Sequence, residues 1–219
     1  MRSVLATTML FVAAGTSTLA LAAPRLHPLK AYTVEYKQEG MQVGTVIEHS
    51  RNYGNQRSET TDATTNMMGM SIRHHQRVIT EGNKITTLDL TKGTATQTTN
   101  PLYDSIAASM QDKDPVEAGK AMLTAMGGAP TGTSQTIAGE TCQDWKLAQL
   151  GQDICVTSDG LTLLVRSNMA GISMTRTAVK VTRGDGGPDA AFELPKGVKA
   201  TQAPNIQQLM QQMRPPASQ

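Results

Sequence analysis

Hydrophobic and polar residues alternate along most of the chain after its N-terminal segment. Tyr32, Val34 and Tyr36 alternate with polar neighbours, which is the period of two expected for a half-buried strand. Further short segments have the β-branched and apolar residues of strands, with turn residues such as Gly82 between them. These predicted strands are 43–48, 77–80, 84–90, 94–98, 141–148, 152–156, 161–166 and 172–182. The pattern therefore predicts a protein built mostly of antiparallel strands.

Two segments in the middle of the chain have helical spacing instead. Residues 101–110 place apolar side chains at helical intervals. In the next segment Asp114 can cap a helix that has Pro115 at its first position, and Gly127 ends that helix. Residues 206–213 predict a third, short amphipathic helix. The order of strands, helices and strands predicts an α+β fold, in which helices partly cover one curved antiparallel sheet.

The N-terminal segment has the features of a secretory signal peptide. Arg2 supplies the positive charge, residues 9–14 form the densest apolar stretch, and Ala20 and Ala22 make an A-x-A cleavage site. We therefore expect cleavage before Ala23 and export to the periplasm, with an uncleaved N-terminal anchor as the alternative. The segment is too polar for a stable membrane helix, which needs about 20 predominantly apolar residues.

The length and charge of the chain limit its organisation and its partners. We expect a signal peptide at 1–22, a single domain at 23–199, and at 200–219 a short amphipathic helix followed by a polar, proline-containing tail. Lys and Arg number 20 against 18 Asp and Glu, which gives no broad attraction to nucleic acid or anionic membrane. Aromatic residues make up 3% of the chain, which also disfavours single-stranded nucleic-acid sites. We expect neither a nucleic-acid partner nor a stable membrane anchor.

No group of residues has the spacing of a catalytic site. Ser71 lies in a Gly-Met-Ser-Ile-Arg sequence, which lacks the second glycine of a nucleophile elbow. The histidines at 27, 49, 74 and 75 are not spaced with a nucleophile and an orienting carboxylate. We therefore expect a protein that is not an enzyme and that needs no cofactor.

The chain has two cysteines, Cys142 and Cys155. In an oxidising compartment an even count favours pairing, and closing a loop of this size stabilises a fold by about 3 kcal/mol on the chain-entropy model. A redox pair or a metal pair is the alternative, although the spacing matches neither C-x-x-C nor a zinc ribbon. The sequence thus predicts a structural disulfide between Cys142 and Cys155.

Several residues in the C-terminal half form an ordered pattern. They are Ala138, Gly139, Cys142, Trp145, Cys155, Asp159, Gly160, Phe192, Leu194, Pro195 and Gly197. This pattern resembles that of an exported bacterial family known as domain of unknown function 4412, over about the last third of the predicted mature chain. The resemblance implies a relationship to the LolA and LolB lipoprotein carriers, whose fold is an incomplete antiparallel β-barrel with helices covering its concave face. It implies no catalytic residue. The chain also lacks the lipid-attachment cysteine of membrane-anchored LolB-like proteins.

The most unusual local sequence is rich in methionine and histidine, at 67–75. On a strand, Met68, Met70, Ile72 and His74 share one face. Thioether and imidazole ligands suit Cu(I), so that Met68, Met70 and His74 are candidate copper ligands. The alternative is that Met68, Met70 and Ile72 line an apolar interior, where methionine fills irregular gaps.

The abundance of methionine, 13 residues in all, favours the second interpretation. Flexible Met-rich surfaces adapt to varied apolar partners, and a concave sheet under helices would form a cavity. The candidate lining residues are Met68, Met70, Ile72, Met122 and Met126. We expect a non-enzymatic exported protein that binds a lipid or another apolar ligand in the cell envelope. A periplasmic copper-binding protein and a structural or stress-related envelope protein are the alternatives.

Overall fold

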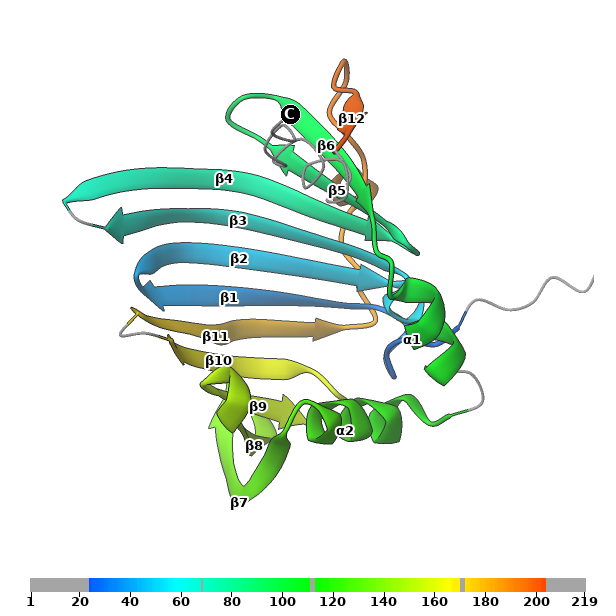
Figure 1. Ribbon diagram of the computed structural model, residues 1–219, viewed down its shortest axis with the longest axis vertical. Helices are drawn as coiled ribbons and strands as arrows, with labels where there is room; N and C mark the ends of the chain where they lie inside the picture. Colours follow the sequence, from blue (N-terminus) through cyan, green and yellow to red (C-terminus); the bar gives the residue numbers. More distant parts are fainter. Residues whose placement is uncertain (1–23, 68, 111–112, 170–171, 204–219) are drawn as a thin grey trace, which may run out of the picture.

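The strands of the computed structural model form one twelve-stranded sheet over the described residues, which are 24–67, 69–110, 113–169 and 172–203 (Figure 1). The strands are β1 (Tyr32–Gly40), β2 (Gln42–Arg51), β3 (Gln56–Met67), β4 (Met70–Glu81), β5 (Lys84–Asp89), β6 (Thr94–Thr99), β7 (Gly128–Ile137), β8 (Glu140–Leu147), β9 (Gln152–Thr157), β10 (Thr162–Met169), β11 (Ile172–Arg183) and β12 (Ala200–Gln202). The helices are α1 (Tyr103–Met110) and α2 (Pro115–Ala125), with 3-10 turns η1 (Asn52–Gly54), η2 (Ala148–Leu150) and η3 (Asp189–Ala191).

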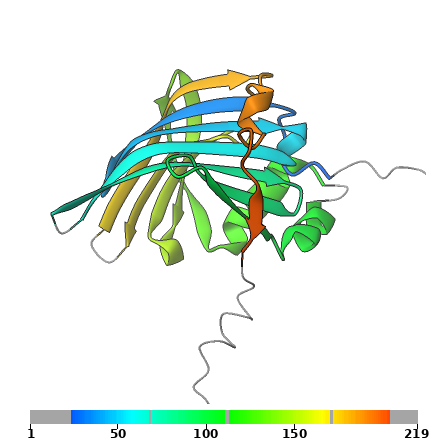
Figure 2. The same ribbon diagram turned by 90° about the horizontal axis from the view of Figure 1, so that it is seen from above.

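The sheet is continuous but open. Its strand order is β12-β6-β5-β4-β3-β2-β1-β11-β10-β9-β8-β7, so that β12 and β7 lie at opposite ends. β1 joins the two halves of the chain, because Tyr32 pairs with Ser50 of β2 on one side and with Arg183 of β11 on the other. All neighbours are antiparallel except β12 and β6, which are parallel. The sheet curves strongly (Figure 2).

The prediction of an α+β incomplete antiparallel barrel with helices covering its concave face is wrong. The structure is dominated by a large mixed sheet, and its two described helices do not cover the concave face (Figure 1). A helix covers a sheet by burying an apolar stripe, but α1 has no buried residue and α2 buries only Ala118. Leu102, just before α1, and Met122 of α2 are instead 61% and 54% exposed. The helices therefore leave most of the sheet uncovered.

The main core lies where β1 and β2 meet β8 to β11. Its buried residues are Tyr32, Val34, Tyr36, Val46, Cys142, Cys155, Leu161, Leu163, Leu164 and Ala178. A smaller cluster of Trp145, Leu147 and Ile154 receives Leu123 and Met126 from the α2 side. Thus α2 packs toward the end of the sheet that holds β7, β8 and β9.

The disulfide between Cys142 and Cys155 is confirmed, with a Cα–Cα distance of 5.4 Å. The two cysteines lie on β8 and β9, which are neighbouring antiparallel strands, and Cys155 pairs in register with Asp144. Both cysteines are fully buried in the main core. The disulfide therefore ties β8 to β9 near the open end of their hairpin, where Cys142 pairs in register with Thr157.

The structure describes only part of the two ends of the chain. β12 extends the sheet beyond residue 199, where the predicted domain ends. The predicted signal peptide at 1–22 and the predicted helix at 206–213 lie outside the described residues. Among the helices that are described, none is long and apolar enough to cross a membrane.

Candidate functional site

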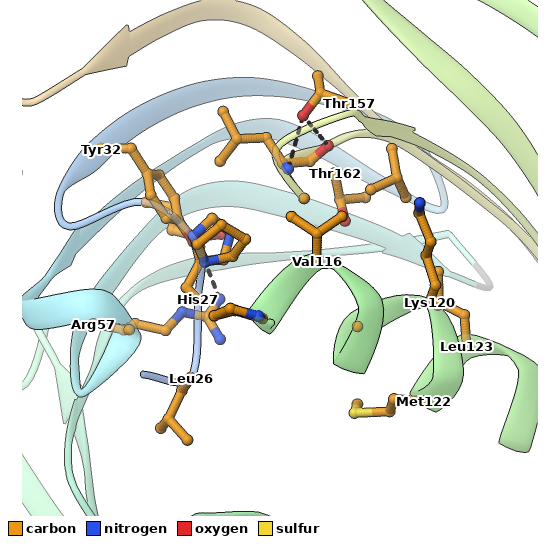
Figure 3. Close-up of a pocket in the computed structure, with 18 of the residues that line it drawn as sticks. Leu26, His27, Tyr32, Arg57, Val116, Lys120, Met122, Leu123, Thr157 and Thr162 are labelled. Atoms are coloured by element: carbon orange, nitrogen blue, oxygen red, sulfur yellow. Dashed lines mark hydrogen bonds and ion pairs between the residues drawn. The ribbon is translucent and has the colours of Figure 1, made fainter. Parts of the chain in front are cut away.

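A pocket of about 840 Å³ lies between α2 and the face of the sheet that carries Tyr32 and Tyr36 (Figure 3). One part of its wall is apolar and comes from α2 and from β8, β9 and β10. The main apolar residues there are Val116, Met122, Leu123, Trp145, Val156 and Val165. Pockets that bind small molecules have this size and this mostly apolar character, with a few placed polar groups.

The polar groups of the pocket come from the other half of the sheet. Glu48 of β2 is 7% exposed and accepts two hydrogen bonds at Oε1, from the Tyr32 hydroxyl at 2.8 Å and from Arg57 Nη2 at 2.9 Å. Arg176 Nη2 lies 3.5 Å from its second oxygen. Burial alone raises the pKa of the Glu48 carboxyl, but Arg57, the Tyr32 hydroxyl and Arg176 outweigh that effect and hold it below its ordinary value. Glu48 is therefore an ionised and fully engaged carboxylate.

Arg176 of β11 is enclosed by three partners. Its Nη1 donates to Glu59 Oε2 at 2.9 Å, and its guanidinium lies over the Tyr36 ring at 4.0 Å. Its side chain is 19% exposed. Burial, followed by the charge of Glu48, raises the pKa of the Tyr36 hydroxyl, which donates to the Thr162 carbonyl oxygen at 3.0 Å. Arg176 thus links β11, β1, β2 and β3 on one face.

Arg57 of β3 differs from Arg176, because its side chain is 49% exposed and lines the pocket. Among the described residues only Nη2 of Arg57 has a hydrogen-bond partner, which is Glu48. The charge of Glu48, opposed by burial, raises the pKa of the Arg57 guanidinium further. Arg57 is therefore a permanent cation with unused N–H donors at the pocket.

The segment before β1 forms a further wall of the pocket. Leu26, His27 and Pro28 line it, and the His27 ring lies 4.7 Å from the Tyr32 ring between centroids. His27 Nδ1 accepts a hydrogen bond from the Leu29 N–H at 3.1 Å, so that this nitrogen carries no proton. Burial lowers the pKa of the His27 imidazole below its ordinary value. The ring is therefore neutral near pH 7.

α2 begins at a well-defined cap and exposes a glycine to the pocket. Asp114 accepts hydrogen bonds from the backbone N–H groups of Val116 and Glu117, as the sequence predicted. Gly119 lies in the middle of this helix and lines the pocket, and no atom lies within 4 Å of the position that a Cβ would occupy. This wall of the pocket therefore has room for a larger side chain.

The four predicted lining residues that the structure describes do not all lie at the pocket. Met122 lines the pocket, and Met126 packs beside it against the smaller core cluster. Met70 and Ile72 lie near the far end of β4, are 58% and 49% exposed, and are not among the lining residues. Met68 lies outside the described residues. The predicted lining set is thus split between two parts of the molecule.

The candidate copper ligands Met70 and His74 share a face of β4, where His74 is half-buried and Met70 is exposed. Met68, the third candidate, is not described. Within the described ranges, no three His, Cys, Asp or Glu side chains are placed to hold a metal ion.

Sequence reasoning missed the charged residues on the sheet side of the pocket, which are Glu48, Arg57, Glu59 and Arg176. The sequence did carry a signal for Glu48, because it lies two positions after Val46 and therefore on the same face of the strand. A carboxylate on the apolar face of an alternating strand is rarely buried without a partner. The partner Arg57 lies in the polar segment Gln56–Met67, which has no hydrophobic alternation to reveal its face.

No family model matches the chain, and neither does any curated protein. Among solved structures, an uncharacterised conserved protein from Thermus thermophilus has a TM-score of 0.52 at 5% identity, covering 80% of this chain and 93% of that one. PNGF-II has a TM-score of 0.42 at 11% identity, covering 83% of this chain and 33% of that one. MucB has a TM-score of 0.43 at 10% identity, covering 78% of this chain and 61% of that one. The similarity to the Thermus protein shows a shared fold, and the resemblance to domain of unknown function 4412 stays a prediction.

Proposed function

We propose that this chain is an exported, non-enzymatic binding protein whose pocket holds a small lipid or another largely apolar molecule. The pocket itself carries the proposal. Its volume of about 840 Å³ falls in the range of small-molecule sites, and one wall is built from Val116, Leu123, Trp145 and other apolar side chains. An exposed apolar surface of this kind is unfavourable in water unless something covers it.

Export is supported by the disulfide and by the predicted signal peptide. Disulfides such as Cys142–Cys155 form and persist in oxidising compartments and are rare in the cytosol. The A-x-A pattern at Ala20 and Ala22 would direct the chain to such a compartment.

Binding without catalysis is supported by the state of the ionisable groups at the pocket. General acids and bases work best with pKa values near the working pH. The pKa of Glu48 lies below its ordinary value, and those of Tyr32 and Tyr36 lie above theirs, chiefly through burial. These groups are also engaged in hydrogen bonds with each other and with the backbone. They are suited to building a fixed wall of the pocket.

Gly119 offers a direct test with a matched control. A Gly119→Phe side chain would enter the space beside Gly119, whereas Gly119→Ala adds one methyl group and improves helix propensity. We expect an environment-sensitive apolar dye, N-phenylnaphthylamine, to bind the wild type and Gly119→Ala alike. We expect Gly119→Phe to bind it about tenfold more weakly, because the phenyl ring would take space that the dye needs, and overpacking of this kind costs roughly 1–3 kcal/mol. Equal binding by all three proteins, or binding by none, would contradict the proposal.

A further inference from the structure

The cations around the pocket are not equivalent. Arg57, Arg176 and Lys120 line it. Arg176 is engaged by Glu48, Glu59 and the Tyr36 ring, as described above. The Lys120 ammonium lies 2.9 Å from Glu117 Oε1, on an exposed part of α2. Arg57 is the more open of the two lining guanidinium groups, with a side chain that is 49% exposed against 19% for Arg176, and only its Nη2 has a hydrogen-bond partner among the residues that the structure describes.

The Glu48 carboxylate, which lies beside Arg57, would repel a bound anion only weakly. Glu48 receives the Tyr32 hydroxyl, Arg57 Nη2 and Arg176 Nη2. Arg176 also pairs with Glu59, so that two guanidinium groups balance the two carboxylates here. The planar guanidinium can use one edge for Glu48 and present another to the pocket, since it has five N–H donors in a fixed arrangement. An anion at that edge would complete the hydrogen bonding of Arg57.

The guanidinium groups and the apolar wall of the pocket lie on different sides of it. Arg57 lies on β3 and Trp145 on β8, and these strands are separated in the sheet by β2, β1, β11, β10 and β9. In Figure 3, His27, Tyr32 and Arg57 lie on one side, while Met122 and Leu123 lie on the other. Because the sheet curves, both sides face the same pocket.

We infer that the ligand is an amphiphile whose anionic head, a carboxylate or a phosphate, binds Arg57 while its apolar chain lies against Val116, Leu123 and Trp145. This inference rests on the proposed function and names the class of its ligand. Arginine binds both kinds of anion through two parallel N–H···O hydrogen bonds. The neutral His27 ring and the Tyr32 ring form the wall next to the head group.

Trp145 allows the inference to be tested directly, because it is the only tryptophan of the chain and lines the pocket. A bromine at the end of an alkyl chain quenches the fluorescence of a nearby indole. The ligands are ω-bromododecanoic acid, ω-bromododecyl phosphate and the neutral ω-bromododecanol. We expect the wild type to bind at least one of the two anions about tenfold or more tighter than the alcohol, since hydrogen bonds to charged groups contribute roughly that factor. The stronger anion identifies carboxylate or phosphate as the head group.

Variants of the lining cations distinguish a failure of the head-group assignment from a failure of the proposed pocket. We expect Arg57→Gln to lose the preference for the anion while it still binds the alcohol, which also shows that the variant is folded. Arg57→Lys, which keeps the charge but not the planar fork, should keep only part of the preference. Arg73→Gln, which changes an exposed arginine outside the pocket, should behave as the wild type. Lys120→Gln tests the competing cation of the pocket, and it should keep the preference for the anion. If all three ligands bind equally, or if the preference depends on Lys120, the head-group assignment is wrong and the pocket proposal stands. If no ligand quenches Trp145, both are wrong.

Discussion

Glu48 and Glu59 lie directly opposite each other on the paired strands β2 and β3. Like charges in this position destabilise a sheet. Arg176 resolves the conflict, because its Nη1 lies 2.9 Å from Glu59 and its Nη2 lies 3.5 Å from Glu48. It reaches them from β11, across the Tyr36 ring. The charged side of the pocket is therefore held together by one side chain from a distant part of the sequence.

Replacing Arg176 should destabilise the fold strongly. Arg176→Met would leave the two facing carboxylates with Arg57 alone and would remove the contact with Tyr36. Breaking a buried ion pair costs about 3–5 kcal/mol, and we expect about 2–4 kcal/mol here because Glu59 is a third exposed. Urea unfolding measures the change.

The control for this experiment is Arg73→Met, which removes an exposed pair with Asp62 on the same sheet. Exposed pairs contribute little to stability, so that its unfolding midpoint should match that of the wild type. Equal effects of the two substitutions would contradict the role of Arg176.

Removing the disulfide should cost about 3 kcal/mol of stability on the chain-entropy model. Cys142 and Cys155 are separated by 13 positions and are both buried, so that Cys142→Ser combined with Cys155→Ser also places two hydroxyls in the core. The oxidised wild type should therefore unfold at the highest urea concentration. The reduced wild type should unfold at a lower concentration, and the double variant at the lowest. A wild type that is insensitive to reductant would show that the disulfide does not form.

Stability should fall on acidification through the protonation of His27. Burial lowers its pKa in the folded protein below the ordinary value of 6.5, and in the unfolded chain that ordinary value applies. The unfolded state therefore binds the proton first. The contribution of His27 to the free energy of unfolding should be constant above pH 6.5. The free energy of unfolding should decrease as the pH falls below 6.5. Protonation at Nδ1 would also break the hydrogen bond from the Leu29 N–H.

His27→Asn is the matched variant, because an amide oxygen can accept the Leu29 hydrogen bond without titrating. Urea unfolding at several pH values should show a shallower dependence below pH 6.5 in this variant. His49, whose pKa burial also lowers, should account for part of the slope that remains. An unchanged slope would show that His27 is not desolvated.

The sequence predicted those helices, strands and turns whose own residues show a regular pattern. The strands with alternating residues, the Glu81–Lys84 hairpin and the Asp114 cap are all confirmed. β3 was missed because Gln56–Met67 is polar except at Ala63 and Met67 and is held by pairing with β2 and β4. β7 was missed because Pro130 argues against a strand, and proline is tolerated there because β7 is the edge of the sheet.

The site was less accessible to sequence reasoning, because it depends on contacts between distant strands. Methionine abundance pointed to Met122, which lines the pocket, and equally to Met70, which begins β4 and does not line it. Glu48, Arg57 and Arg176 meet only through the pairing of β11, β1, β2 and β3. The prediction that helices cover the concave face of the sheet was wrong. The apolar stripe of α2 in the sequence does not show how much of a large sheet that helix can cover.

Native mass spectrometry of the protein purified from its own host tests the central claim most directly. The account predicts a non-covalent adduct of one amphiphile that can be extracted into organic solvent and that is absent from Gly119→Phe but present in Gly119→Ala. The cysteine pair should appear as the loss of two hydrogens. Protein without an adduct, or an adduct of a single copper ion in place of an organic molecule, would contradict the account.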